Sequence, residues 1–345
     1  MKKQSKNKKK KKLTSLLLLC FLTIIMISIS TYAWFTANKT VTVSSLDVNV
    51  TASSGLQVSV DGFEWKTVIS NADITGASTA GNYNNAINQV PTVLAPVSTA
   101  GEFVTGGGYL QMFSGTVIDN ASGDFALTAK EAEEKNRSGA DAGEFIAFDL
   151  FLKNDSTEPL TPLYLSSESG VIPKIGSSDS GLKNASRIAF VVQGNTASDS
   201  LLSVVQGLKT TSANDVYIWE PNYDAHSSHA IIAAKSTYDI TTTDGGGQIN
   251  YDGVKKEITN SIILKETNKD KNPEFFERVT PKYITSKGYS TIAPGTDYLA
   301  IFSLKPGITK LRIYMWVEGQ DVDCENNASG TDISFNVQFT LNKTK

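Results

Sequence analysis

Two histidines, His226 and His229, are the only imidazole groups in the chain, and they stand three residues apart. Zinc proteases instead place two histidines four residues apart on a helix, with a glutamate directly after the first as general base. Here Ser227 follows His226, and two residues three apart in a strand face opposite sides. The pattern favours two surface-loop histidines, with a shared metal site as the alternative.

A second group of residues with metal-binding chemistry lies between Glu318 and Asn327, in the loop that joins the last two expected strands. Carboxylate and carbonyl oxygens are the ligands that Ca²⁺ prefers, although this spacing does not match the twelve-residue EF-hand loop. We expect either a solvated acidic turn or a Ca²⁺ site. The candidate ligands are Glu318, Asp321, Asp323 and Glu325.

Cys324 lies in the same loop, and the chain has one other cysteine, Cys20, near its start. A free cysteine usually packs as a small hydrophobe, so we expect Cys324 to be buried; a free thiol and an intermolecular bridge are the alternatives. The sequence contains no G-x-S-x-G, Walker A or dinucleotide-binding motif, and no Cys–His pair at a usable spacing. It therefore specifies no enzyme and, Ca²⁺ aside, no cofactor.

The first 33 residues predict export. Eight lysines fall within the first twelve residues, and an uncharged, largely apolar stretch follows from Leu13 to Ala33. This is the pattern of a secretory signal peptide, and Thr31 and Ala33 supply small residues for a cut between Ala33 and Trp34. The alternative is an uncleaved anchor, which would be the chain's single membrane segment. We expect a secreted or surface protein whose first partner is a signal peptidase.

The charge of the remaining chain argues against binding to nucleic acid. The formal net charge is −3, but without the eight leader lysines 24 basic and 35 acidic residues remain, a net charge of −11. An acidic exported protein is repelled by phosphate backbones and anionic membrane surfaces. The lack of cysteine pairs fits an exported Gram-positive protein better than a eukaryotic secreted one.

Most of the chain on either side of these residues shows the sequence pattern of β-strands. Residues 143–154, 298–304, 311–317 and 333–341 show apolar alternation with period two. We predict an all-β fold: an antiparallel, jelly-roll-like sandwich over residues 34–345, with long insertions at about 70–140 and 195–290. Short helices are expected at 127–135, where Ala, Glu and Lys cluster, and at 199–208, with Leu201, Leu202, Val204 and Val205 facing inward.

Residues 31–49 carry a resemblance to a known family. The leader ending in TYAWFTAN, followed by SSLDVNV, resembles the start of the TasA and camelysin group, which are exported Gram-positive proteins cut by a SipW-type signal peptidase. The resemblance implies a jelly-roll domain that forms biofilm-matrix fibres, in which the N-terminal arm adds a strand to a neighbouring subunit. The matching arm residues are Trp34, Phe35, Val41, Val43, Leu46, Val48 and Val50.

The function expected from the sequence is therefore structural. We expect an exported, self-associating protein of the cell surface or biofilm matrix. A cell-surface adhesin or ligand-binding module is the alternative, since the long loops offer binding surfaces. Camelysins have been described as metalloproteases, but the chain has no HExxH motif, so the resemblance does not extend to that activity.

Overall fold

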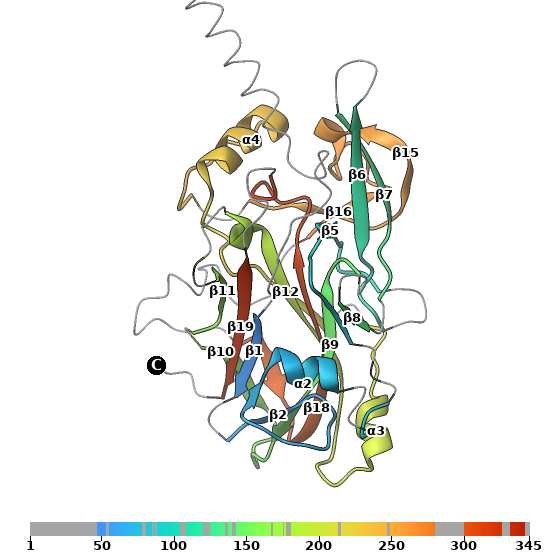
Figure 1. Ribbon diagram of the computed structural model, residues 1–345, viewed down its shortest axis with the longest axis vertical. Helices are drawn as coiled ribbons and strands as arrows, with labels where there is room; N and C mark the ends of the chain where they lie inside the picture. The colour runs from blue at the N-terminus through green and yellow to red at the C-terminus, as the bar shows by residue number, and fades with distance from the viewer. Residues whose placement is uncertain are drawn as a thin grey trace, which may run out of the picture.

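A computed structural model gives the fold. The described residues form a β-sandwich with loops and a few short helices (Figure 1), so the predicted all-β sandwich is confirmed. Within these residues no helix is long and apolar enough to cross a membrane. The structure describes residues 47–341 apart from 53–54, 78–80, 85, 87, 104–107, 120–124, 135–136, 140–142, 167, 175, 177–180, 213–214, 247–248, 280–299 and 326–331.

One layer of the sandwich is a six-stranded sheet in the order β17-β10-β19-β1-β3, with β11 also paired to β19. Its central contact is unusual because β1, the first described strand, runs parallel to β19, the last. The remaining pairs in this sheet are antiparallel. The strands are β1 (Asp47–Ala52), β3 (Val68–Ile69), β10 (Thr161–Leu165), β11 (Gly170–Pro173), β17 (Phe302–Leu304) and β19 (Ile333–Thr340).

The other layer is a seven-stranded sheet in the order β13-β12-β18-β9-β4-β8, with β2 also paired to β9. Its long strands β12, β18 and β9 are antiparallel neighbours, and β9 lies inside the sheet, as its apolar sequence predicts. The strands are β2 (Gln57–Ser59), β4 (Gln89–Pro91), β8 (Arg137–Gly139), β9 (Ile146–Asn154), β12 (Ser186–Thr196), β13 (Val216–Trp219) and β18 (Gly307–Val317).

Apolar side chains from the two sheets meet in one core. The registers Phe148↔Ile313 and Leu150↔Leu311 place the inward residues of β9 and β18 side by side. Phe335 and Phe339 of β19 enter the same core from the other sheet. The alternation along each strand thus fixes which face is inward, because neighbouring side chains point to opposite faces.

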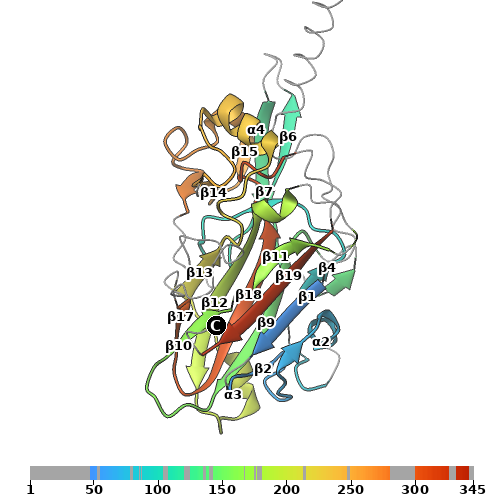
Figure 2. The same cartoon turned by 90° about the vertical axis from the view of Figure 1, so that its left-hand side faces the viewer.

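A third group of elements lies beyond one end of the sandwich, as Figures 1 and 2 show. It contains a four-stranded sheet in the order β15-β7-β6-β5, a two-stranded pair β14-β16, and helix α4. The elements are β5 (Val97–Ser98), β6 (Phe113–Asp119), β7 (Phe125–Glu131), α4 (Ser228–Tyr238), β14 (Asp252–Val254), β15 (Ile258–Ile263), η3 (Leu264–Glu266) and β16 (Phe276–Arg278).

The other helices are short. Helix α2 (Asn71–Gly76) begins with a capping box, in which the Ser70 and Asp73 side chains each bond the other's backbone N–H. Helix α3 (Leu202–Gly207) confirms the helix expected at 199–208, but only Val205 is buried; Leu202 is half-buried, Leu201 is 74% exposed and Val204 48%. The helix expected at 127–135 is wrong. That segment is mostly β7, because pairing with β6 and β15 overrides helix propensity. A 3₁₀ turn, η1 (Leu182–Ala185), precedes β12.

Candidate functional site

The acidic loop, defined as residues 318–325, follows β18 directly and is buried rather than solvated. The Glu318 N–H donates to the Ala185 carbonyl at 2.7 Å, and the Gly319 N–H donates to the Val97 carbonyl at 2.9 Å. The loop is thereby attached to the turn before β12 and to β5. The expected solvated turn is wrong. The four candidate ligands are all at most 5% exposed: Glu318, Asp321, Asp323 and Glu325.

Arg187, at the start of β12, is the main cation that compensates this loop. Its side chain is fully buried, and Nη2 lies 2.8 Å from Glu220 Oε1 and forms an ion pair with Asp321. The Tyr251 ring lies under the guanidinium, 5.2 Å from Cζ to the ring centroid. Burial lowers the pKa of Arg187, but the attraction of Glu220 and Asp321 outweighs it and raises that pKa above its usual value. Arg187 is therefore a permanent charge within the fold.

Asp323 has a different partner, His226. The His226 Nδ1 lies 2.8 Å from Asp323 Oδ2, and both side chains are buried. The other carboxylate oxygen accepts the Ser227 N–H at 3.0 Å, at the start of α4. Burial raises the pKa of Asp323, and the hydrogen bond from His226 opposes that rise. The expectation of two surface-loop histidines is thus wrong for His226, while His229 is exposed on α4.

Glu318 is the third carboxylate with an internal role. Its oxygens accept hydrogen bonds from Trp316 Nε1 and from the Gln320 N–H, both at 3.0 Å. Burial nevertheless raises the pKa of Glu318 from 4.5 to about 7, because these bonds and that from Ser98 only partly replace water. This group therefore changes charge near neutral pH.

The geometry of the loop disperses the four candidate ligands. Asp321 faces Arg187 and Asp323 faces His226, so their oxygens do not converge on one point. Across the described part of the chain, no three or more His, Cys, Asp and Glu side chains are grouped so that they could hold a metal ion. Cys324 is 5% exposed, which confirms its expected burial, and burial raises the pKa of its thiol.

A second charge cluster lies on the outward face of the seven-stranded sheet, and sequence reasoning missed it. Asp149 of β9 is directly opposite Arg312 of β18 and accepts its Nη1 at 3.0 Å. Lys310 Nζ lies 3.1 Å from the same carboxylate, and Tyr83 Oη donates to it at 2.5 Å. Glu134 pairs with Arg312 Nη2 at 2.7 Å. The sequence pattern that could have indicated this cluster is the presence of one acidic residue, Asp149, and two basic residues, Lys310 and Arg312, in two strands that are otherwise strongly apolar.

This outer cluster borders a cavity of about 330 Å³. Gln206 and Lys209, from α3 and the segment after it, also line this cavity. Lys310 Nζ also donates to the Gln206 carbonyl at 2.6 Å. Every charge at its floor is thus paired within the chain, and the cluster joins α3 to the sheet.

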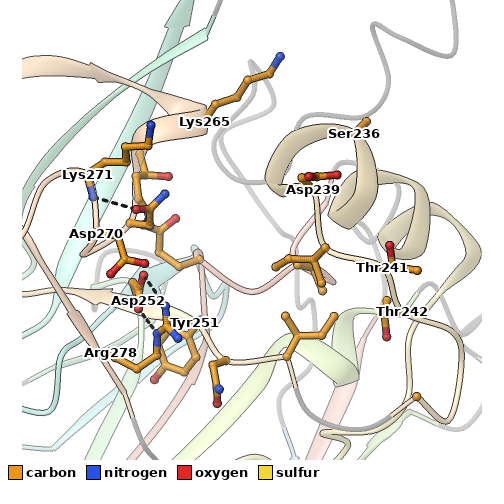
Figure 3. A pocket seen from close by; sticks show the side chains of 18 residues that line it. Ser236, Asp239, Thr241, Thr242, Tyr251, Asp252, Lys265, Asp270, Lys271 and Arg278 are labelled. Carbon is orange, nitrogen blue, oxygen red and sulfur yellow. Dashed lines mark hydrogen bonds and ion pairs between the residues drawn. The ribbon is translucent and has the colours of Figure 1, made fainter.

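A larger cavity of about 820 Å³ lies beside the acidic loop, between the segment after α4 and the turn after η3 (Figure 3). Gln320 and Val322 of the acidic loop contribute to its lining. Its walls carry mostly polar and charged side chains, including Asp239, Asp252 and Lys271.

The expected N-terminal arm is described only at its end. Val48 and Val50 lie in β1, where they pair with Phe335 and Val337 of the chain's own β19. The Val50 side chain is buried in the sandwich core. The cleavage residues Ala33 and Trp34 and the arm residues Trp34, Phe35, Val41, Val43 and Leu46 lie outside the described residues.

Comparisons with protein-family models, with curated proteins and with solved structures gave no match. The resemblance of residues 31–49 to the TasA and camelysin group therefore stays a prediction.

Proposed function

We propose that the protein is an exported, non-enzymatic structural component of the cell surface or biofilm matrix, and that it self-associates by exchange of its N-terminal strand. The observation that carries the proposal is the position of β1. It is the first strand of the described residues, yet it lies between β19 and β3 in the six-stranded sheet. A leader followed by an extended arm, as the sequence predicts, would place β1 next to a free end after cleavage.

The pairing of β1 is suited to strand exchange, because most of its backbone pairs are made with a single neighbouring strand, β19. Six residues of β1 pair with β19, whereas β3 pairs with β1 over two residues. Withdrawal of β1 would expose the β19 edge, because β10 and β11 occupy only its other side. An exposed strand edge is a template for a strand from another copy. A chain that gives its β1 to the next copy and receives one from another would form an open head-to-tail polymer.

The charge clusters support a structural role rather than catalysis. Asp321 and Asp323 are engaged by Arg187 and His226 inside the fold, and Asp149 is engaged by Arg312 and Lys310. Buried ion pairs of this kind fix one arrangement of the elements around them.

Electron microscopy of the secreted protein, recovered with its natural N-terminus, tests the proposal. We expect fibres or ordered oligomers that disappear when residues 34–52 are deleted. Material that stays monomeric with the arm intact, across protein concentration, pH and salt, would contradict it. N-terminal sequencing of the same material shows whether the cut falls after Ala33.

A cell-surface adhesin or ligand-binding module is the second candidate. The cavity of about 820 Å³ favours it, because small-molecule sites usually enclose roughly 300–1,000 Å³. The two candidates are compatible, since β1 lies in the sandwich whereas the cavity is built mainly from elements beyond its end.

A further inference from the structure

The walls of the 820 Å³ cavity come from two segments that the fold holds in place. On one side, the turn after η3 presents Asp270 and Lys271 (Figure 3). Asn268 holds this turn: its side-chain Oδ1 accepts the Lys271 N–H at 3.0 Å, and its carbonyl accepts the Asn272 N–H at 2.9 Å. The opposite side carries Ser236, Asp239, Thr241 and Thr242, from α4 and the segment after it. A wall held in this way loses little conformational entropy on binding.

The polar groups in the cavity divide into paired and available ones. Arg278 Nη2 donates to Asp252 Oδ2 at 3.3 Å, so these two side chains stabilise each other. By contrast, none of the hydrogen bonds and ion pairs between described residues engages the side chains of Lys265, Asp270 or Lys271. Two ammonium groups and the Asp270 carboxylate are therefore available to a ligand, and Asp270 also interacts electrostatically with Arg278.

The formal charges of the lining residues sum to zero, with three basic side chains (Lys265, Lys271 and Arg278) and three acidic ones (Asp239, Asp252 and Asp270). Asp239 is also paired with Lys235, which lies outside the lining. A polyanion in the cavity would be repelled by these carboxylates. An apolar ligand would bury the polar groups of the lining without hydrogen-bond partners, which is unfavourable. The remaining polar lining is made of hydroxyl and amide groups: Ser236, Thr241, Thr242, Asn250, Thr267, Asn268 and Gln320.

We propose that this cavity binds an uncharged oligosaccharide. Sugar hydroxyls both donate and accept hydrogen bonds, so they match a lining of mixed donors and acceptors with no net charge. The apolar part of the lining is small: Ile240 and Ile249 are half-buried and Val322 is 4% exposed, and such side chains can pack against the C–H face of a sugar ring. Tyr251, the aromatic residue of the described lining, is only 4% exposed and packs against Arg187. The inference rests on the second candidate function and supplies its ligand class.

A glycan array of neutral and anionic oligosaccharides, followed by calorimetric titration of the strongest neutral binder, tests the proposal. We expect Lys271→Ala and Asp270→Ala each to weaken binding about tenfold, the loss of one charge-assisted hydrogen bond. The controls are Lys269→Ala and Glu274→Ala, which make the same charge changes nearby but outside the cavity lining. Asp270, Lys271 and Glu274 are exposed and Lys269 is half-buried, so all four variants should fold like the wild type.

Three results would overturn the proposal. If no neutral oligosaccharide binds at millimolar concentration, the cavity is not a glycan site. If a neutral oligosaccharide binds but Lys271→Ala and Asp270→Ala leave its affinity unchanged, it binds elsewhere. If an anionic glycan or a peptide binds instead and these two variants weaken it, the ligand-binding function stands but the proposed ligand class is wrong.

Discussion

The imidazole of His226 lies 2.8 Å from the carboxylate of Asp323, and this contact joins the start of α4 to the acidic loop after β18. Both side chains are buried, and 97 residues separate them in sequence. The contact therefore helps to fix the elements beyond the sandwich to its end.

Replacing His226 by alanine should destabilise the fold. The change leaves the buried Asp323 carboxylate without its imidazole partner, although the Ser227 N–H still donates to it, and such a loss typically costs about 1–3 kcal/mol. Urea unfolding at neutral pH measures the loss. His229→Ala is the matched control: its side chain is exposed on the same helix, so a change within about 0.5 kcal/mol is expected. Equal effects of the two changes would contradict the role given to the His226–Asp323 pair.

Arg187→Ala should be more severe, because it strands Glu220 and Asp321 in a buried site. A cost of about 3–5 kcal/mol is expected from denaturant unfolding. The triple variant Arg187→Met, Glu220→Gln and Asp321→Asn removes all three charges together. It should be more stable than Arg187→Ala alone, because no charge is left uncompensated. A triple variant less stable than the single one would show that the ion pairs are not what Arg187 contributes.

Glu318 should make stability depend on pH. Its folded pKa of about 7 lies above the ordinary value of 4.5, so the folded state binds the proton more tightly. This contribution is fully present below about pH 4.5 and is lost as pH rises through about 7, on the order of 3 kcal/mol. Unfolding free energies of the wild type and Glu318→Gln should therefore diverge over this window, with the wild type falling relative to the variant. Parallel pH profiles would contradict the assignment.

The outer cluster predicts the opposite pH behaviour. Burial raises the pKa of Asp149, but Arg312 and Lys310 outweigh it, and the pKa falls below 3.8. Its stabilising contribution is thus present above about pH 4 and is lost as pH falls further. Asp149→Ala removes the carboxylate shared by Arg312 and Lys310, while Arg312 keeps Glu134 and Lys310 keeps the Gln206 carbonyl. Its cost at neutral pH, measured by urea unfolding, should therefore fall near the lower end of the roughly 3–5 kcal/mol typical of a broken buried pair. Asp155→Ala, whose side chain is 60% exposed, should change stability little, and a comparable loss there would refute the interpretation.

The sandwich could be predicted from sequence because its long strands carry the signal themselves. β19 alternates apolar and polar residues, and β9 and β18 carry an apolar residue at every second position over residues 146–152 and 311–317; the inward residues of all three strands meet in the core. β7 was missed because Ala129, Lys130 and Glu131 favour a helix locally, and pairing with β6 and β15 makes the segment a strand. Local composition cannot report partners that are distant in sequence.

The candidate ligands were found as a group, but their environment was not. Nothing in residues 318–325 shows that Arg187 and His226 lie against them, since both come from distant segments. The outer cluster was missed for a related reason. Asp149 and Arg312 read as ordinary outward polar residues until the register of β9 and β18 places them opposite each other. Whether a charged residue on the outward face is buried depends on which segments cover that face, and the alternation of residues along a strand does not predict these segments.

Exchange of β1 between copies can be tested by the register of β1 on β19. Thr51 pairs with Gln338, and both side chains lie on the partly exposed face of the sheet. Paired residues of adjacent strands are close enough for a disulfide. In a Cys324→Ala background without the leader, Thr51→Cys and Gln338→Cys are made as separate single variants, mixed and oxidised. Strand exchange predicts covalent dimers that contain one chain of each variant, and none between Lys66→Cys and Gln338→Cys, because Lys66 pairs with Val58 instead. Assembled protein without mixed dimers, together with a double Thr51→Cys and Gln338→Cys chain that closes only on itself, would show that β1 stays in its own sheet and would contradict strand exchange.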